Sequence, residues 1–199
     1  EHEAHLGALV VLAPGALVVL GLGVVGLLTS ALLMNDGARV VGSEPRSWRR
    51  ATARRFGITA VSPDELGATV QSQSAQRGAG VVIEASGDPA ALAAGLPLLA
   101  HEGTALVASW YGSRPVPLPL GADFHRRRLT IRSSQVSTIP ADQQPYWTIE
   151  RRRQAALALL DELPVAALAT HTFAFDDAAE AFAAVDRGGD RLVHAALCY

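Results

Sequence analysis

Three glycines and one carboxylate have the spacing of a site for a phosphate-linked nucleotide. Gly21, Gly23 and Gly26 form a G-x-G-x-x-G element, and Glu44 follows 18 residues after Gly26. In such an element the first glycine makes a tight turn, the second lets the backbone approach a pyrophosphate, and the third lets a helix pack closely on a strand. A carboxylate at the place of Glu44 can accept hydrogen bonds from two ribose hydroxyls. Together these residues predict dinucleotide binding.

The residues around the glycines predict the elements that would position them. Residues 16–20 are a continuous valine-rich apolar run, typical of a strand buried on both faces of a parallel sheet. Residues 24–35 read as a helix and residues 39–42 as a second strand. The start of that helix, at Val24 and Val25, would offer free N–H groups and a positive dipole end to the phosphates. In the purely structural alternative, the glycines serve only a turn and Glu44 is an ordinary exposed acid. That alternative does not explain why the strand, the glycines, the helix and the carboxylate occur in the order that dinucleotide binding requires.

Strands and helices alternate through most of the remaining chain. Further strands are expected at 58–61, 80–85, 104–108 and 129–136, with helices capped by Ser47, from 63 to about 76 and from 89 to 100, and with a turn at 102–103. This alternation predicts an α/β fold, a Rossmann doubly wound parallel sheet. The strand order 3-2-1-4-5-6 follows by analogy with that fold. A helix at 149–163, a strand at 170–175, a helix at 176–187 and a strand at 192–197 predict a small C-terminal α/β extension. The expected domains are an N-terminal segment at 1–12, an NAD-binding Rossmann domain at 13–163 and a C-terminal tail at 164–199.

Composition excludes several classes of function. The formal charge of −2 and a pI near 6.3 give no general attraction to nucleic acid or anionic membrane. Arginine triplets at 126–128 and 151–153 lack a recognition motif, so we expect no nucleic-acid partner. All 17 basic residues are arginine, which excludes lysine Schiff-base chemistry. The single cysteine and an acidic N-terminus without a secretory signal predict a cytoplasmic protein.

One segment is long and apolar enough to raise the possibility of a membrane span. Residues 6–35 carry no charge, which meets the usual length for a transmembrane helix. Pro14-Gly15 interrupts the run as a turn, and flanking arginines are absent. The spacing of the glycines carries a more specific meaning, so we expect no membrane association.

The sequence resembles the medium-chain dehydrogenase/reductases, a family that includes zinc-dependent alcohol and polyol dehydrogenases and threonine dehydrogenases. The similar segments, which cover nearly the whole chain from Ala13 onward, are residues 21–26 with 40–44, 82–87, 106–108, and 170–173 followed by 176–182. Residues 83–87 and 173–182 are the more specific of these. The resemblance implies hydride transfer between a nicotinamide and a small alcohol or carbonyl substrate.

The resemblance also implies roles for individual residues. Glu44 would bind the adenosine ribose, with Arg49 beside it. The residues implied near the adenine and the nicotinamide-side ribose are Ala85, Ser86 and Gly87, and those at the nicotinamide mouth are Ser109, Trp110 and Tyr111. The two aromatic residues could equally be packing groups. A carboxylate at Glu44 repels a 2′-phosphate and favours NAD over NADP, although Arg46, Arg49 and Arg50 could bind that phosphate or form a solvated helix face.

In that family a separate N-terminal lobe supplies the zinc ligands and most of the substrate pocket. With one cysteine, Cys198, and no ligand spacing among the histidines, we expect no zinc or other metal site in this chain. His2 and His5, with their neighbouring acids, could at most bind a stray ion. The catalytic residues are therefore unknown. Four side chains could transfer a proton, those of Ser109, Tyr111, His125 and His171, and of these we retain Tyr111 and His125 as candidates.

These observations leave more than one functional interpretation. The chain is expected to be an NAD(P)(H)-binding oxidoreductase domain that is incomplete without a catalytic lobe. It could be a fragment, one half of a pair of chains or a stand-alone protein. The alternative is a non-catalytic NAD(H)-binding sensor or scaffold. An apolar surface near Phe173, Phe175 and residues 192–197 predicts a homo-oligomer or a partner chain.

Overall fold

The computed structural model describes residues 16–75, 77–189 and 191–199. The expected segment 1–12, the turn at Pro14-Gly15 and the stray metal site at His2 and His5 lie outside these residues. Contacts divide the chain into two compact units, one through Ser134 and one from Gln135 to Tyr199. The functional division expected at residue 163 stays a prediction. Each unit is described by itself.

The first unit is built on a six-stranded parallel sheet of order β3-β2-β1-β4-β5-β6, which confirms the predicted fold and strand order. Its strands are β1 (Leu17–Leu20), β2 (Val40–Ser43), β3 (Thr59–Val61), β4 (Ala79–Glu84), β5 (Leu99–Val107) and β6 (Thr130–Ser133). The connecting helices are α2 (Val24–Asn35), α3 (Ser47–Arg55), α4 (Pro63–Gln73), α5 (Pro89–Gly95), η1 (Leu96–Leu98) and η2 (Leu120–Phe124).

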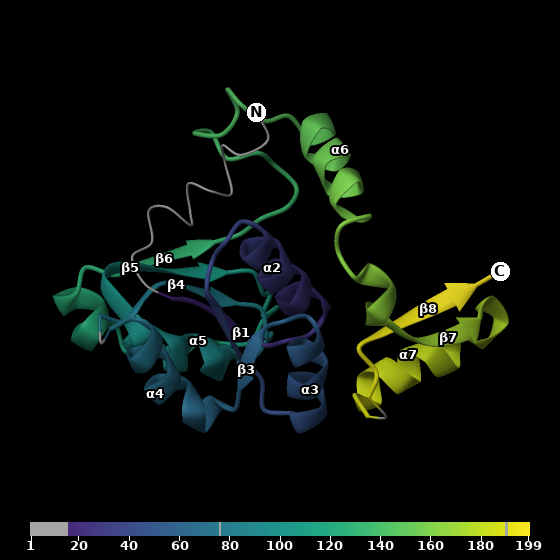
Figure 1. The fold of residues 1–199 in the computed structure, drawn as a ribbon, viewed down its shortest axis with the longest axis horizontal. Coiled ribbons are helices and arrows are strands. Elements are labelled where there is room, and N and C mark those ends of the chain that lie inside the picture. The colour runs from purple at the N-terminus through teal and green to yellow at the C-terminus, as the bar shows by residue number, and fades with distance from the viewer. Residues whose placement is uncertain (1–15, 76, 190) are drawn as a thin grey trace. The chain divides into compact units, whose positions relative to one another are not determined.

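Helices cover both faces of this sheet, so its central strands are buried throughout. A Cβ built on Gly26 of α2 would lie 3.4 Å from Val19, whereas one built on Gly95 of α5 would lie 2.9 Å from Leu20. Successive strand residues point to opposite faces. Thus α2 and α5 lie on opposite sides of the sheet (Figure 1). Burial on both faces explains why the strands read as apolar runs rather than as an alternation.

Local sequence determines the ends of several helices. Pro63 stands at the start of α4, and the Glu65 carboxylate accepts hydrogen bonds from the amide (2.9 Å) and hydroxyl (2.8 Å) of Ser62. This capping arrangement confirms the predicted helix start. The predicted cap of α3 was wrong, because Arg46 is its N-cap and Ser47 already lies inside the helix.

The region between α5 and β5 also differs from expectation. The helix expected to reach Ala100 ends at Gly95, continues as one short turn to Leu98, and gives way to a strand at Leu99. Pro97 lacks the N–H that a longer helix requires. The expected turn at Glu102-Gly103 is instead an irregularity within β5, where Glu102 has a φ of 60°.

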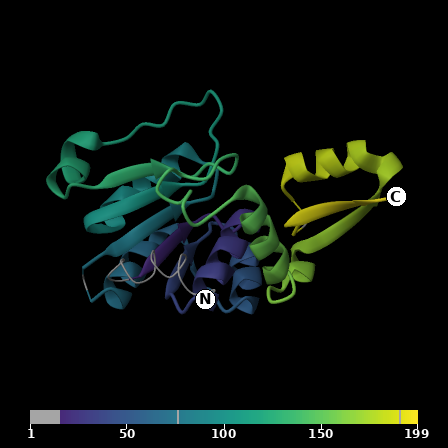
Figure 2. The ribbon, with the colours of Figure 1, turned by 90° about the horizontal axis from the view of Figure 1, so that it is seen from above.

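The second unit forms the predicted small α/β extension. Its elements are α6 (Ile149–Leu159), η3 (Val165–Leu168), β7 (Ala169–Ala174), η4 (Phe175–Asp177), α7 (Ala178–Arg187) and β8 (His194–Cys198). Strands β7 and β8 pair in parallel, with α7 as the crossover between them. Figure 2 shows α7 lying along the two strands. Within the described part of both units, no helix has the length and apolar character needed to cross a membrane.

Candidate functional site

The turn between β1 and α2 leaves no room for side chains at two of its three glycines. Gly21 has a φ of +87°, and a Cβ built on it would lie 2.5 Å from Cα of Ser86. A Cβ on Gly26 would lie 1.9 Å from the Gly21 carbonyl oxygen. Both positions therefore require glycine to form the turn and to pack α2 against β1.

Gly23 differs from these two glycines because the fold itself leaves space beside it. The nearest atom to a Cβ built there is Nη1 of Arg49, at 3.8 Å, which is an ordinary contact distance. The first intrahelical bond of α2 runs from the Leu27 amide to the Gly23 carbonyl at 2.9 Å. The amides of Val24, Val25 and Gly26 precede that bond, in the positions where a helix has no intrahelical acceptors. An anion bound next to Gly23 would meet these N–H groups and the positive end of the helix.

The Glu44 carboxylate lies directly after β2 and ties that strand to the glycine turn. Glu44 is only 3% exposed. Its Oε2 accepts a hydrogen bond from the Leu22 amide at 3.1 Å, and its Oε1 accepts one from the Arg46 amide at 3.1 Å. Each carboxylate oxygen has more than one acceptor direction, so both could also receive a ribose hydroxyl.

The arginines after Glu44 have different tasks in the structure. Nη1 of Arg50 donates to the carbonyl oxygens of Glu44 (2.8 Å) and Pro45 (2.7 Å), so Arg50 holds the loop. Nη1 of Arg49 lies 3.9 Å from Glu44 Oε2, and its Nε is buried without a hydrogen-bond partner within the described residues. Burial lowers the pKa of the Arg49 guanidinium, an effect that the neighbouring Glu44 carboxylate opposes. Arg49 is thus the cation that lies beside the expected ribose position.

Glu84, at the end of β4, was missed by the sequence reasoning. Its side chain is fully buried. Oε1 accepts hydrogen bonds from the amide (2.7 Å) and hydroxyl (2.5 Å) of Ser86, and Oε2 accepts one from the Tyr111 hydroxyl at 2.5 Å. The sequence feature that could have identified it is a charged residue at the end of an otherwise apolar strand, because a buried charge requires hydrogen-bond partners.

Two more contacts join the loops that follow β4 and β5. The Gly87 amide donates to Ser109 Oγ at 2.9 Å, and Nη2 of Arg114 donates to the Gly87 carbonyl at 2.6 Å. Ala85 continues the sheet through a bond from its amide to the Leu20 carbonyl at 2.8 Å. Between Ser109 and Tyr111, Trp110 is 91% exposed, so its ring is not a core packing group of this unit.

The residues expected to bind a cofactor therefore gather at one edge of the sheet, the edge where β1, β2, β4 and β5 end. The two catalytic candidates differ in position. Tyr111 lies at this edge, but burial and the Glu84 carboxylate raise the pKa of its hydroxyl, which keeps it a hydrogen-bond donor. His125 follows η2 and precedes β6, which places it at the opposite edge, where the parallel strands begin. His171 belongs to β7 in the second unit.

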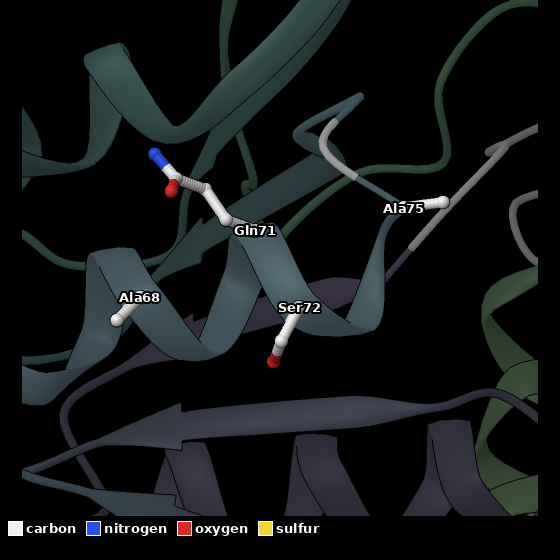
Figure 3. Close-up of a pocket in the computed structure, with 4 residues that line it drawn as sticks. All are labelled: Ala68, Gln71, Ser72 and Ala75. Atoms are coloured by element: carbon white, nitrogen blue, oxygen red, sulfur yellow. The ribbon is translucent and has the colours of Figure 1, made fainter.

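A hollow of about 380 Å³ lies elsewhere on the first unit, along α4 and the turn that follows it. It is lined by Ala68, Gln71, Ser72 and Ala75. Figure 3 shows the side chains of Gln71 and Ser72 leaving the helix in different directions, so their polar groups do not converge on one point. None of these four residues is charged, and the Ser72 hydroxyl donates to the Thr69 carbonyl of its own helix at 2.9 Å.

The arginine triplets serve mainly to hold the fold. Arg127 donates to the carbonyl oxygens of Pro97 (3.2 Å) and Leu99 (2.7 Å) and pairs with Asp123, and Arg128 pairs with Glu102. In the second triplet, Arg152 donates to the Val136 carbonyl at 2.5 Å. These contacts give Arg127, Arg128 and Arg152 partners within the protein.

A zinc site would need a cluster of histidine, cysteine or acidic side chains. Across residues 16–75, 77–189 and 191–199, no group of three or more such residues is arranged to hold a metal ion. The described residues therefore do not fit a zinc ion.

Known proteins share both the sequence pattern and the fold. D-guloside 3-dehydrogenase of Escherichia coli (strain K12) is 31% identical over 147 residues, which are 72% of this chain and 42% of that protein. The alcohol dehydrogenase of Thermus sp. ATN1 superimposes with a TM-score of 0.77 at 21% identity over 94% of this chain and 51% of that one. An alcohol dehydrogenase of E. coli CFT073 solved with NADH gives a TM-score of 0.73 at 19% identity over 93% and 52% of the two chains.

The chain thus spans about half the length of the proteins that it matches. The family model described as zinc-binding dehydrogenase matches residues 24–151, which include α2, Glu44, Glu84 and the loop after β5. On this match the chain belongs to the zinc-binding dehydrogenase family.

Proposed function

We propose that the first unit binds NAD(H) at the carboxyl edge of its sheet, with the pyrophosphate next to Gly23. The observation that carries this proposal is the contrast among the three glycines, because the fold alone requires glycine at Gly21 and Gly26 but leaves room for a side chain at Gly23. A ligand that must approach the backbone closely explains the glycine at position 23. The helix start beyond it supplies the N–H groups that a pyrophosphate needs.

In this proposal each half of the sheet receives one half of the dinucleotide. Glu44 and Arg49, after β2, would take the adenosine ribose. The nicotinamide half would lie beside the loops after β4 and β5, against Ala85, Ser86 and Gly87 and next to Ser109, Trp110 and Tyr111. The bound cofactor would supply the hydride acceptor or donor, while these residues orient it.

The proposed preference is for NAD over NADP. The Glu44 carboxylate is buried and would repel a 2′-phosphate held beside it. Arg50, one of the three nearby cations, already donates to two backbone carbonyls, which leaves Arg49 as the principal cation facing Glu44. With Arg50 held by backbone carbonyls and Arg49 shared with a carboxylate, the loop is a weaker phosphate site than three free arginines would be.

For the whole protein we propose hydride transfer between the nicotinamide and a small alcohol or carbonyl compound, because the related proteins are named dehydrogenases. The remaining groups for that reaction would come from protein outside the described residues. Phe175, Phe182 and Val185 of the second unit are 48%, 73% and 51% exposed. We propose that further protein, from the same chain or another, covers them.

The test is a fluorescence titration of NADH and NADPH with the purified chain and its Glu44→Gln variant. Wild type should bind NADH more tightly than NADPH, and Glu44→Gln should lose about tenfold in NADH affinity, the equivalent of one hydrogen bond to a charged group. The loss should be smaller for NADPH because the repulsion is removed as well. Glu150→Gln, in the second unit, is the matched control and should leave both affinities unchanged. Equal binding of NADH to wild type and Glu44→Gln would contradict the proposal.

A further inference from the structure

A buried carboxylate lies at the junction of the three loops that surround the proposed dinucleotide site. Glu84 is fully buried, and both of its oxygens are used within the first unit. One oxygen holds Ser86, whose backbone lies against Gly21 in the pyrophosphate turn. The other oxygen holds the hydroxyl of Tyr111, which is 27 residues away along the chain.

Burying the Glu84 carboxylate costs free energy, and its hydrogen bonds must offset that cost. Removing a charge from water is expensive, and hydrogen bonds to its oxygens offset that cost only when the geometry is good. All three donors to Glu84 lie within 2.7 Å. An apolar residue would close a buried strand at lower cost, so the carboxylate is best explained by what its partners do.

The loop that Glu84 reaches through Tyr111 carries one exposed aromatic ring, that of Trp110. Ser109 accepts a hydrogen bond from the Gly87 amide, and Tyr111 is bound to Glu84, so the residues on both sides of Trp110 are anchored. Arg114 closes the same loop onto the Gly87 carbonyl. Trp110 itself is 91% exposed, which leaves its ring presented at the edge of the sheet.

We propose that Glu84 is a positioning residue that, through the Tyr111 hydroxyl, holds the loop Ser109–Arg114 in the form that receives the nicotinamide half of the dinucleotide. This inference rests on the proposed function. It adds a residue that does not itself contact the ligand, and it separates the two halves of the site: Glu84 acts on the nicotinamide half, whereas Glu44 acts on the adenosine half.

Tyr111→Phe removes only the hydroxyl and is the mildest test. Hydrogen exchange of the ligand-free protein should quicken at least threefold in residues 109–114 and stay unchanged in β1, β2 and β3, because the loop loses an anchor while the adenosine half keeps its contacts. Affinity for NADH should fall about tenfold, the equivalent of one hydrogen bond to a charged group. Affinity for AMP and ADP-ribose, which lack the nicotinamide, should stay within about twofold of wild type.

Glu84→Gln should show the same pattern, and Tyr111→Phe should add little to it in the double variant, since the two residues act as one unit. Tyr199→Phe, on a fully exposed tyrosine of the second unit, is the matched control. If Tyr111→Phe keeps wild-type NADH affinity, or loses AMP and NADH equally, the positioning role is overturned while NAD binding stands. If wild type binds none of the three ligands, the proposed function fails and the positioning role fails with it.

Discussion

The three glycines of the turn should respond differently to the same substitution, and this contrast tests the pyrophosphate position. At Gly23 a Cβ would meet only Arg49 Nη1 at 3.8 Å, and the backbone φ of −76° suits alanine. Gly23→Ala should therefore change the free energy of unfolding by less than about 0.5 kcal/mol. At Gly26 a Cβ would lie 1.9 Å from a backbone oxygen, so Gly26→Ala should cost about 3 kcal/mol or more.

Gly23→Ala, which should keep its stability, should nevertheless lose affinity for NADH. The methyl group of Gly23→Ala would occupy the space through which the pyrophosphate approaches the helix start. Losing one or two charge-assisted hydrogen bonds, at about 1.5 kcal/mol each, corresponds to a 10- to 100-fold loss of NADH affinity. Urea unfolding and calorimetric titration measure the two quantities. Gly23→Ala with normal stability and undiminished NADH affinity would refute the proposed pyrophosphate position.

Three further predictions concern the fold of the first unit. Gly67→Ala, inside α4 with no atom within 4 Å of the new methyl, should raise the free energy of unfolding by about 1 kcal/mol, and a lower midpoint in urea would contradict this. Arg127→Ala should cost about 1–2 kcal/mol because it frees the carbonyls of Pro97 and Leu99, and thermal melting would show it. Hydrogen bonds from Ser62 hold the pKa of Glu65 below its usual range. The stability that this contact adds is therefore complete above the pKa of Glu65 in the unfolded chain and is lost as the pH falls through its pKa in the folded protein. A normal pKa in an NMR titration of the Glu65 carboxyl group would be inconsistent with the capping contact.

The glycine turn and the elements beside it could be predicted because their signals are local, whereas the strand order followed by analogy with the doubly wound fold. The apolar run at 17–20, the three glycines and the boundaries of the helix Val24–Asn35 are all fixed by neighbouring residues. The end of α5 was harder to place, since alanine-rich sequence favours a helix to residue 100 while Pro97 and the tertiary contacts of Arg127 end it early. There, tertiary structure overrides propensity.

The contacts within the candidate site depend on pairs that are far apart in the sequence. Nothing local to Tyr111 indicates that its hydroxyl meets Glu84, and nothing local to Leu22 indicates that its amide meets Glu44. His125 was considered for proton transfer on residue type, but the direction of β6 places it at the edge where the strands begin. Residue type gave the candidates, and only the register of the sheet could say which of them meet.

The most direct test of NAD binding at the glycine turn is an ¹⁵N–¹H NMR titration of the purified chain with NADH. The proposed binding site predicts saturable shifts of the backbone amides of Gly21, Gly23 and Gly26 and of the loop after β4, with the amides of α7 unmoved. Absence of shifts at saturating NADH, or shifts confined to the second unit, would contradict it.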